Sequence, residues 1–402
     1  MELTILSRPM TEPLEVAERK GRGHPDTLTD GLAEELSVQY CLYTRKRFGA
    51  VLHHNFDKVG MLGGRSEARL GEGHILAPIR VLLNGRASGQ FRSEEIPLQE
   101  LLPEWATIFL KRELSLLDTS RHLTFHYNVS GANTAGYPTS DFSPRSESDL
   151  FQSFQVLSSD TATVCIQYPM RPVEGMVLAV EQHLTSDVYR SSHPWLGSDI
   201  KVMACGSERA VSITACVPQI ASNVPDISAY QANLESVRED IHSVVANHLP
   251  DARVDIKLNT LDDFNRGSLY LTVIGSCIES GDEGMVGRGN RPSGVIAPLQ
   301  PFSGEAACGK NPVFFPGKVY TAAGKEIARR LHELSGARID VWLLSQEGRP
   351  LSDPWKAVVW HDGGELSRVV VQDTLNEVLS HIPDLTESML RREVRLCYYR
   401  GQ

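Results

Sequence analysis

The sequence predicts an α/β (α+β) fold built from more than one domain. Runs rich in β-branched residues alternate along the whole chain with longer segments of helical periodicity, so neither an all-helical nor an all-β protein is expected. The chain has 402 residues, which is more than one compact core usually holds, and two or three domains are therefore expected. Hydrophobic residues make up 41% and charged residues 22%, as in ordinary globular proteins.

Six runs are expected to be strands because they are β-branched or alternate apolar with polar residues, and because Gly, Pro, Asn or Asp bounds them. They are residues 50–55, 79–83, 200–204, 210–218, 254–258 and 268–274. Three helices are expected, at residues 30–48, 237–248 and 319–335. Apolar or aromatic residues follow the helical repeat in the first of these, and Asp26 or Thr27 is its expected N-cap.

Charge and cysteine content exclude several classes of protein. The formal net charge of −10 argues against a protein whose whole surface binds nucleic acid or an anionic membrane. The seven cysteines are scattered without a CxxC pair, so neither a disulfide framework nor a structural zinc site is expected. The N-terminus lacks the pattern of a signal peptide, and no apolar run approaches the ~20 residues of a membrane span. We therefore expect a cytoplasmic protein without nucleic-acid or membrane partners.

The most informative segment is 281–318, which is rich in glycine and has little periodicity. Glycines let a backbone approach an anion closely, while Arg and Lys supply the charge that polyphosphate oxygens require. Acids beside them suit magnesium that bridges carboxylate and phosphate. The segment matches neither a Walker A loop nor a GxGxxG turn, and a charged surface loop is the alternative. Its charged candidates are Asp282, Glu283, Arg288, Arg291, Glu305, Lys310 and Lys318.

A second candidate segment, residues 18–30, reads ERKGRGHPDTLTD. His24 and Asp26 are held two residues apart by Pro25, immediately ahead of a predicted helix. In the functional interpretation Asp26 binds a cation and His24 contacts the reacting centre, with the helix N-terminus favouring anions. The alternative is that the acid only caps the helix, which is the more common use of an acid at this position.

Two further segments carry weaker candidates. His53 and His54 are adjacent on a predicted strand and point to opposite faces, so they cannot form a shared-face metal pair, and one is expected to be a core histidine. Asp57, at the end of this strand, is the better candidate for a substrate contact. Asp160 lies in a polar turn before an apolar run, where Asp is common for structural reasons alone.

Taken together, these segments resemble the archaeal-type S-adenosylmethionine synthetases (methionine adenosyltransferases), of which the chain looks like a divergent member. The resemblance runs from about residue 18 to residue 351 and therefore covers most of the chain. Two of the matching strings, GDEGMVGRGNR and EAACGKNP, are long and unusual, which makes chance similarity improbable. The other strings are ERKGRGHPD, DGLAEE, VLHHNFDKV, DIKVM, GKVY and LLSQEGRPL.

The resemblance implies three similar sheet-plus-helix domains with pseudo-threefold symmetry, interleaved in sequence. An N-terminal-type domain is expected to combine residues 1–22 with 150–275. A central domain, carrying HPD and the polyphosphate loop, combines 23–115 with 276–318. A C-terminal-type domain combines 116–149 with 319–402. The resemblance also implies a homodimer with active sites at the subunit interface.

The implied activity is adenosyl transfer from ATP to the sulfur of L-methionine, with Mg²⁺ and K⁺ as cofactors. The sulfur attacks C5′ of ATP, and the released tripolyphosphate is hydrolysed to phosphate and pyrophosphate. Three alternatives stay open: a different thioether or thiol acceptor, release of intact tripolyphosphate, and a non-catalytic paralogue that binds nucleotide.

Site roles carry over where the motifs are intact. His24, Arg288 and Lys310 are implied to be catalytic. The ATP or polyphosphate ligands would be His24, Asp160, Arg288, Arg291, Lys310 and Lys318. Asp57, Lys58 and Asp282 would bind the acceptor, and Asp26 and Glu305 would bind metal.

Departures from the family pattern lie close to these residues. Where the family usually reads NPVNHVGK or NPVSHVGK, this chain has Phe314 and Phe315 in place of a polar pair that contains His. Aromatic rings cannot ligate magnesium or neutralise phosphate, which bears on the fate of the tripolyphosphate. The usual HHNTDQV has become HHNFDKV, which adds Phe56 and Lys58 beside the expected acceptor contact.

Overall fold

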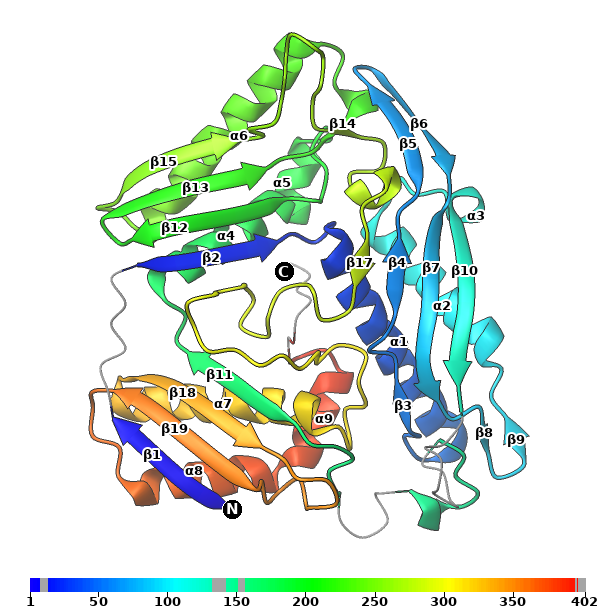
Figure 1. Ribbon diagram of the computed structural model, residues 1–402, viewed down its shortest axis with the longest axis vertical. Helices are drawn as coiled ribbons and strands as arrows, with labels where there is room; N and C mark the ends of the chain where they lie inside the picture. Colours follow the sequence, from blue (N-terminus) through cyan, green and yellow to red (C-terminus); the bar gives the residue numbers. More distant parts are fainter. Residues whose placement is uncertain (8–13, 132–141, 151–155, 395, 397–402) are drawn as a thin grey trace.

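The computed structural model describes residues 1–7, 14–131, 142–150, 156–394 and 396. Three sheets, each backed by helices, surround a long segment that follows β17 (Gly284–Met285) and crosses the middle of the molecule (Figure 1). The mixed α/β class expected from the sequence is confirmed. Within the described residues, no helix has the length and apolar character needed to cross a membrane.

The first sheet has the strand order β15-β13-β12-β2, with α4 and α6 packed on one face. Residues of β13 alternate between buried and exposed, so that Val211, Ile213 and Ala215 face the helices. The elements are β2 (Glu15–Lys20), β12 (Lys201–Ser207), β13 (Ala210–Cys216), β15 (Arg253–Leu258), α4 (Pro172–Thr185) and α6 (Ile227–His248).

The second sheet has the order β10-β7-β4-β17, with β3 beside β7. Its core joins Val81 and Leu83 of β7 to Leu32 and Leu36 of α1 and to Phe109 of α2. The elements are β3 (His54–Asn55), β4 (Gly60–Leu62), β7 (Ile79–Ala87), β10 (Leu123–Ser130), α1 (Pro25–Phe48) and α2 (Leu98–Glu113).

The third sheet has the order β1-β19-β18-β11 and packs against α7, α8 and α9. Its core includes Val341 of β18, Val359 of β19 and Ile327 of α7, all nearly or fully buried. The elements are β1 (Glu2–Ser7), β11 (Thr163–Tyr168), β18 (Arg338–Leu344), β19 (Lys356–Asp362), α7 (Pro316–Ser335), α8 (Arg368–Ser380) and α9 (Ile382–Leu390).

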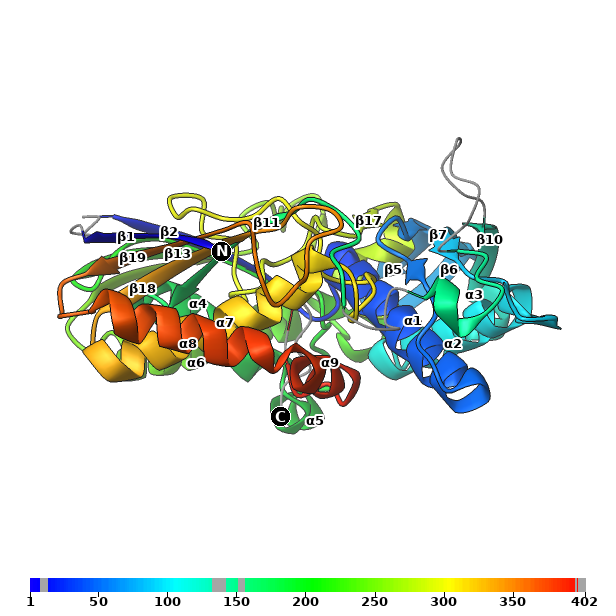
Figure 2. The same ribbon diagram turned by 90° about the horizontal axis from the view of Figure 1, so that it is seen from below.

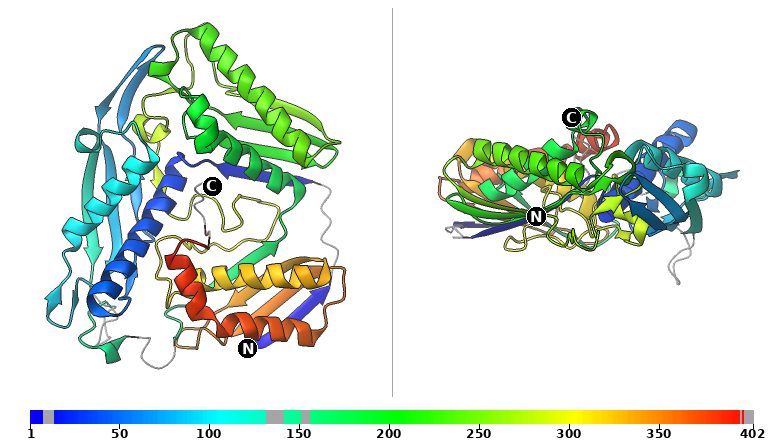
Figure 3. Two further views of the ribbon diagram at one scale, coloured as in Figure 1. Left: turned by 180° about the vertical axis from the view of Figure 1, so that it is seen from behind. Right: turned by 90° about the horizontal axis from the view of Figure 1, so that it is seen from above.

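Shorter elements connect the three sheets. They are β5 (Arg65–Arg69), β6 (Glu72–Ala77), β8 (Gln90–Phe91), β9 (Glu94–Glu95), α3 (Thr119–His122), α5 (Asp187–Ser192), β14 (Gln219–Ile220), β16 (Leu271–Thr272) and three short 3₁₀ turns at Glu147–Asp149, Ala221–Asn223 and Cys277–Ser280. Seen from the side, the strands lie toward one face of the molecule and the helices α6 to α9 toward the other (Figure 2). Seen from behind, helices cover all three sheets (Figure 3).

Sequence periodicity located the centres of elements better than their ends. The expected helix at 30–48 begins five residues earlier, at Pro25, because His24 caps it and proline suits the first helical position. The expected N-cap at Asp26 or Thr27 is therefore wrong, since both residues lie inside α1. The expected strands at 50–55 and 268–274 form only the two-residue strands β3 and β16.

Strand pairing crosses the domain ranges expected from the resemblance. β1 pairs with β19 and β11 with β18, so strands from 1–22 and from 150–275 share a sheet with strands from 319–402. β10, from 116–149, pairs with β7 of the second sheet. Contacts between such distant segments are not encoded in any local pattern. The three-domain division and its pseudo-threefold symmetry stay predictions.

Candidate active site

The turn between β2 and α1 is held against residues 198–200, the irregular segment immediately before β12. The amides of Gly21 and Gly23 donate to the carbonyls of Ile200 at 2.6 Å and Ser198 at 2.8 Å. A Cβ atom at Gly23 would lie 2.2 Å from Ser198 Oγ, so this close approach requires glycine. The turn presents His24 at the start of α1, where its Nδ1 accepts a hydrogen bond from the Asp26 amide at 3.1 Å.

Asp26 connects the start of α1 to the glycine-rich segment. Its Oδ2 lies 2.9 Å from Lys20 Nζ, and its Oδ1 accepts a hydrogen bond from the Met285 amide at 3.1 Å. Lys20 Nζ also donates to the carbonyl of Arg288 at 2.7 Å. Gly284 lies so close to α1 that a Cβ there would be 2.1 Å from the Pro25 carbonyl oxygen. Two segments more than 250 residues apart, 20–26 and 284–288, therefore form one rigid unit.

One turn further along α1, Asp30 is a buried acid that the sequence did not single out. Its Oδ1 accepts a hydrogen bond from the Gly287 amide at 2.8 Å, while its Oδ2 is buried without a hydrogen-bond partner among the described residues. Burial raises the pKa of Asp30 to about 7. Arg291 does not extend outward from this loop, because its Nη2 donates to the carbonyls of Gly287 at 2.5 Å and Gly289 at 2.9 Å. In this structure Arg291 therefore braces the loop.

A cavity of about 460 Å³ opens beside His24. Burial lowers the pKa of His24 to about 4, so its ring is neutral near pH 7. Asp282 is exposed at the same cavity, and Lys201, whose Nζ lies 3.3 Å from Glu18 Oε2, also lines it. The structure thus brings together His24 and Asp282, two of the residues expected from the sequence to act on substrate.

Several residues of this cavity were missed by the sequence interpretation. Tyr270 donates or accepts a hydrogen bond with the thiol of Cys277 at 2.9 Å, and Asp199 accepts one from the Cys277 amide at 2.8 Å. Burial raises the pKa of Asp199 to about 7. Asp199 belongs to the string DIKVM, one of those that resemble the family, but it was not among the candidate site residues. The remaining lining residues are Cys216, Asn259, Thr260, Leu261, Asp262, Ser268 and Leu269.

A second group of charges surrounds Lys310. Lys310 Nζ lies 2.8 Å from Asp57 Oδ2 and 3.8 Å from the centre of the Phe315 ring. Lys58 Nζ contacts the same Asp57 oxygen at 2.5 Å, but the Lys58 side chain is 66% exposed. Burial acts to raise the pKa of Asp57, yet Lys310 and Lys58 outweigh it and hold this pKa below its ordinary value. Burial raises the pKa of the neighbouring Glu305, against the opposing charge of Lys310.

Lys318 lies beneath this group and is fully buried. Its Nζ lies 2.8 Å from Glu34 and donates to the Lys310 carbonyl at 2.8 Å. The Lys310 carbonyl also accepts from Ser37 Oγ at 3.0 Å. In this structure the Lys318 ammonium fixes the backbone of Lys310, and the direct polyphosphate contact expected for Lys318 stays a prediction.

The remaining candidates are exposed. Arg288 is exposed, and no ion pair of its side chain with another described residue is found. Asp160 is also exposed, and its carbonyl accepts hydrogen bonds from Ser158 at 2.7 Å and Ser345 at 3.0 Å. Both side chains are accessible for a ligand.

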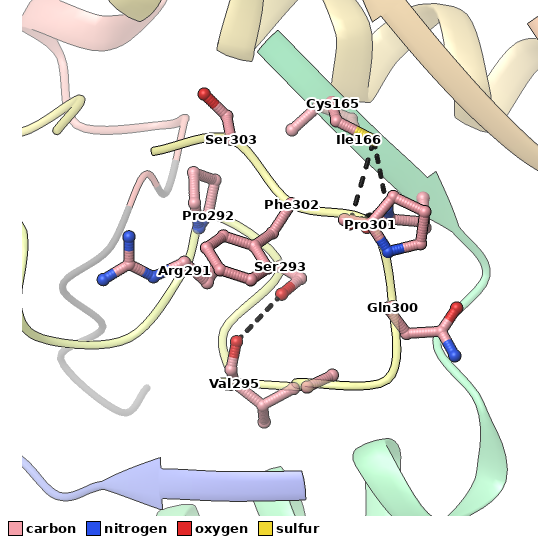
Figure 4. A pocket seen from close by; sticks show the side chains of 12 residues that line it. Cys165, Ile166, Arg291, Pro292, Ser293, Val295, Gln300, Pro301, Phe302 and Ser303 are labelled. Atoms are coloured by element: carbon pink, nitrogen blue, oxygen red, sulfur yellow. Dashed lines mark hydrogen bonds between the residues drawn. The ribbon is translucent and has the colours of Figure 1, made fainter. Parts of the chain in front are cut away.

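A small cavity of about 20 Å³ lies between β11 and the central segment. Figure 4 shows Phe302 and Arg291 beside each other at this cavity, and the Arg291 guanidinium lies 5.9 Å from the centre of the Phe302 ring. Its volume is about that of one water, so it cannot hold a substrate.

The adjacent histidines are structural, as the alternation along the strand suggested for one of them. His54 is buried, with Nε2 2.8 Å from Ser37 Oγ and Nδ1 3.1 Å from the Leu52 carbonyl. His53 stacks on Phe314, with 4.2 Å between the ring centres and 12° between the planes. Burial lowers the pKa of both histidines to about 3, so neither carries charge near neutral pH.

The two charged groups contact different parts of α1. The first group, which comprises Lys20, Asp26 and the backbone of residues 285–288, meets α1 at Asp26. The second group, around Lys310, meets α1 at Ser37, which is roughly 16 Å further along a helix that rises about 1.5 Å per residue. Among the residues that the structure describes, no cluster of three or more His, Cys, Asp or Glu side chains has the arrangement of a metal site. An α/β protein with buried Lys–Asp pairs, a neutral histidine at a helix start and a cavity lined in part by charged side chains has the features of an enzyme that acts on charged small molecules.

Comparison with known proteins identifies the family. Residues 4–393 match the S-adenosylmethionine synthetase (AdoMet synthetase) family, and the chain belongs to it. The S-adenosylmethionine synthase of Hyperthermus butylicus is 37% identical over 350 residues, covering 85% of this chain and 84% of that protein. The probable S-adenosylmethionine synthase of Aquifex aeolicus is 37% identical over 365 residues, covering 87% and 88%. That of Pyrobaculum aerophilum is 34% identical over 394 residues, covering 95% and 96%.

A solved structure agrees with this fold. It is described as an unusual S-adenosylmethionine synthetase from Campylobacter jejuni, with a TM-score of 0.61, 14% identity and coverage of 97% of this chain and 95% of that one. The chain is therefore an enzyme of the methionine adenosyltransferase class, and the resemblance stated from its motifs is confirmed.

Proposed function

We propose that this enzyme converts ATP, L-methionine and water to S-adenosylmethionine, phosphate and pyrophosphate. The methionine sulfur attacks C5′ of ATP, a C–S bond forms, and the C–O bond to the departing tripolyphosphate breaks. The observation that carries this proposal is the meeting of segments 20–26 and 282–288. Asp26 binds the Met285 amide, Lys20 binds the Arg288 carbonyl, and His24 and Asp282 line the same cavity.

His24 is suited to donate a hydrogen bond to ATP. Its Nδ1 accepts from the Asp26 amide, so the neutral ring carries its proton on Nε2. Nε2–H is then available for the oxygen that joins the ribose to the triphosphate, where negative charge develops as the bond breaks. A neutral donor at this position needs no change of protonation between pH 6 and pH 8.

The leaving tripolyphosphate requires cations, which the second charged group supplies. Lys310 is held in place at both its backbone and its ammonium group. Arg288, an exposed residue whose carbonyl accepts from Lys20, is proposed to supply a further cation from the group around Asp26. A fixed, desolvated ammonium stabilises developing charge more strongly than a solvated one, because it needs no reorganisation during the reaction. Asp160 and Asp57 are proposed to hold the ATP and the acceptor, respectively, with Asp282 and Lys58 also on the acceptor side.

Asp26, in the group around Lys20, and Glu305, in the group around Lys310, are proposed as separate carboxylate ligands for magnesium. Asp26 already holds the ammonium of Lys20 at 2.9 Å, so its carboxylate accepts a cation at this place. In phosphate sites Mg²⁺ usually takes one or two protein carboxylates, and phosphate oxygens and water complete its shell. A large cluster of protein ligands is therefore not needed. When bound, the ion neutralises phosphate charge; the requirement for K⁺ rests on the family resemblance.

We also propose a cytoplasmic homodimer, which the family resemblance implies. Two features support the dimer: the charged groups are separated along α1, and the strands of all three sheets lie toward one side of the molecule (Figure 2). A partner placed on that side would cover the exposed outer residues of strands such as β13, including Ser212 and Thr214. Light scattering coupled to size-exclusion chromatography tests this proposal, and a monomer at the concentration of the activity assay would refute it.

The reaction is tested by incubating the protein with ATP, Mg²⁺, K⁺ and methionine and analysing adenosylated products and phosphate species by mass spectrometry. S-Adenosylmethionine together with phosphate and pyrophosphate is the expected result. Parallel incubations use other thioethers and thiols. A product formed only from another acceptor, or tripolyphosphate left intact, would correct the proposed reaction. Nucleotide binding without any product would support the non-catalytic alternative.

A further inference from the structure

Phe315 is a residue whose position in the second charged group is not explained by packing alone. It lies immediately before α7 and is 2% exposed. Its ring centre is 3.8 Å from Lys310 Nζ, and the same ammonium group contacts Asp57. The ring therefore contacts the ammonium group of Lys310, the group that is proposed to bind the polyphosphate.

The remainder of Lys310 is fixed by backbone contacts. Its carbonyl accepts hydrogen bonds from Ser37 Oγ at 3.0 Å and Lys318 Nζ at 2.8 Å, and its backbone forms an isolated bridge with Asn55. These contacts hold the start of the side chain but leave four rotatable bonds to its ammonium. Among the described residues, Asp57 and the Phe315 ring contact the ammonium group itself, and the charge of Glu305 also acts on it.

The two partners differ in their electrostatic effect. Asp57 orients the ammonium but also neutralises it, as a carboxylate must. The face of an aromatic ring attracts a cation through its quadrupole and carries no net charge, so the ring holds Lys310 in place and leaves its positive charge available.

We infer that Phe315 is a positioning residue that fixes the Lys310 ammonium toward the polyphosphate of ATP. The inference rests on the proposed function, in which Lys310 binds this group. Phe315 does not touch the reacting atoms and acts only through Lys310. In this view the aromatic substitution that departs from the family pattern is a functional part of the site.

Phe314 provides a matched control in the same segment. It is fully buried, like its neighbour, but stacks on the neutral ring of His53 at 4.2 Å. Phe314→Leu and Phe315→Leu therefore remove similar apolar area from the start of α7, and Phe315→Leu removes the ring that lies 3.8 Å from Lys310 Nζ. Phe315→Tyr keeps the ring and serves as the conservative variant.

The experiment measures tripolyphosphate binding by isothermal titration calorimetry in the presence of Mg²⁺, together with kcat and KM for ATP and for methionine. Phe315→Leu is expected to weaken tripolyphosphate binding and to lower kcat/KM for ATP by about tenfold, a loss that corresponds to about 1.4 kcal/mol. KM for methionine should change less than twofold, and Phe315→Tyr should restore most of the affinity. Phe314→Leu should lower the melting temperature as much as Phe315→Leu but leave the affinity within about twofold of wild type.

Equal loss of tripolyphosphate affinity in both leucine variants, or no loss in Phe315→Leu, would overturn the positioning role while wild-type turnover still supports the proposed function. A wild-type protein that neither binds tripolyphosphate nor forms product would overturn the proposed function and this inference with it. Affinity is measured on folded protein, and a variant that unfolds is recognised by its melting curve. If Phe315→Leu unfolds, the test compares wild type with Phe315→Tyr, which should keep most of the tripolyphosphate affinity.

Discussion

Replacing Lys310 by alanine tests the assignment of the polyphosphate site most directly. The substitution removes an ammonium that lies 2.8 Å from Asp57 Oδ2 and 3.8 Å from the Phe315 ring centre. Breaking a buried ion pair costs about 3–5 kcal/mol, because it leaves one charge without its partner. Here Lys58 remains 2.5 Å from the same carboxylate oxygen, so we expect the cost to lie near the lower limit.

A loss of about 3 kcal/mol leaves a typical protein folded, since unfolding free energies are roughly 5–15 kcal/mol. The loss of kcat should be more evident than the loss of unfolding free energy. Removing one preorganised donor from developing charge usually lowers kcat by about 10²–10³-fold. We therefore expect Lys310→Ala to be folded at 25 °C, with kcat for S-adenosylmethionine formation reduced by about that factor.

Lys58→Ala is the comparison for this experiment: because Lys58 is proposed to contact the acceptor, its loss should raise KM for methionine and leave kcat at saturating methionine largely intact. Lys58 contacts the same Asp57 oxygen, but its side chain is 66% exposed, and exposed ion pairs contribute only about 0–1 kcal/mol. The assay follows S-adenosylmethionine by chromatography at saturating ATP and methionine, with a melting curve for each variant. The reasoning would be refuted if Lys310→Ala kept kcat within about threefold of wild type, or if both variants lost the same activity while folded.

Three further predictions concern the first charged group. Burial raises the pKa of Asp30 to about 7, so folding favours its protonated form, and this contribution to stability is lost as pH rises from about 4 to 7. Over this pH range the unfolding free energy of Asp30→Asn, measured by urea titration, should therefore fall less than that of wild type. Equal pH slopes of the two unfolding free energies would contradict the raised pKa. Gly284→Ala places a Cβ 2.1 Å from the Pro25 carbonyl oxygen and should lower both the melting temperature and the activity. At Gly304 an added Cβ meets no described atom within 4 Å, so Gly304→Ala should leave both quantities unchanged. Asp26→Asn should raise the Mg²⁺ concentration needed for half-maximal activity by at least tenfold, and an unchanged requirement in this titration would exclude Asp26 as a metal ligand.

Local sequence signals predicted the regular elements of this fold and missed its long-range pairing. The helices near 30–48, 237–248 and 319–335 were found because a stripe of apolar residues repeats with the helical period. The partner of β1 could not be found in this way, because a six-residue strand has no local property that distinguishes β19 from other strands. Similarly, the cap at His24 was missed because histidine is not among the usual N-cap residues.

The candidate site was predicted in part. The glycine and charge pattern of 281–318 indicated an anion site, and the structure joins its first half to the segment around Asp26. Which of the charged residues are accessible to a ligand depends on burial, which the sequence pattern does not show. Lys310 and Lys318 have the same charge and lie eight residues apart, yet Lys318 is committed to Glu34 beneath the site. Asp199 and Tyr270 were not expected in the cavity, because an alternating strand pattern does not reveal which polar residue faces a ligand.

The pairing of β1 with β19 has a consequence for synthesis on the ribosome. Residues Glu2 to Ser7 pair in parallel with Lys356 to His361, so β1 leaves the ribosome long before the strand with which it pairs. The sheets that contain β2 and β7 close much earlier, at β15 and β17 respectively. During this interval β1 is an unpaired edge with apolar residues such as Leu3 and Ile5, which makes it vulnerable to misassembly with other nascent chains. A chain shortened before residue 356 would therefore lose the partner of its own N-terminus and would leave the third sheet without its edge strand.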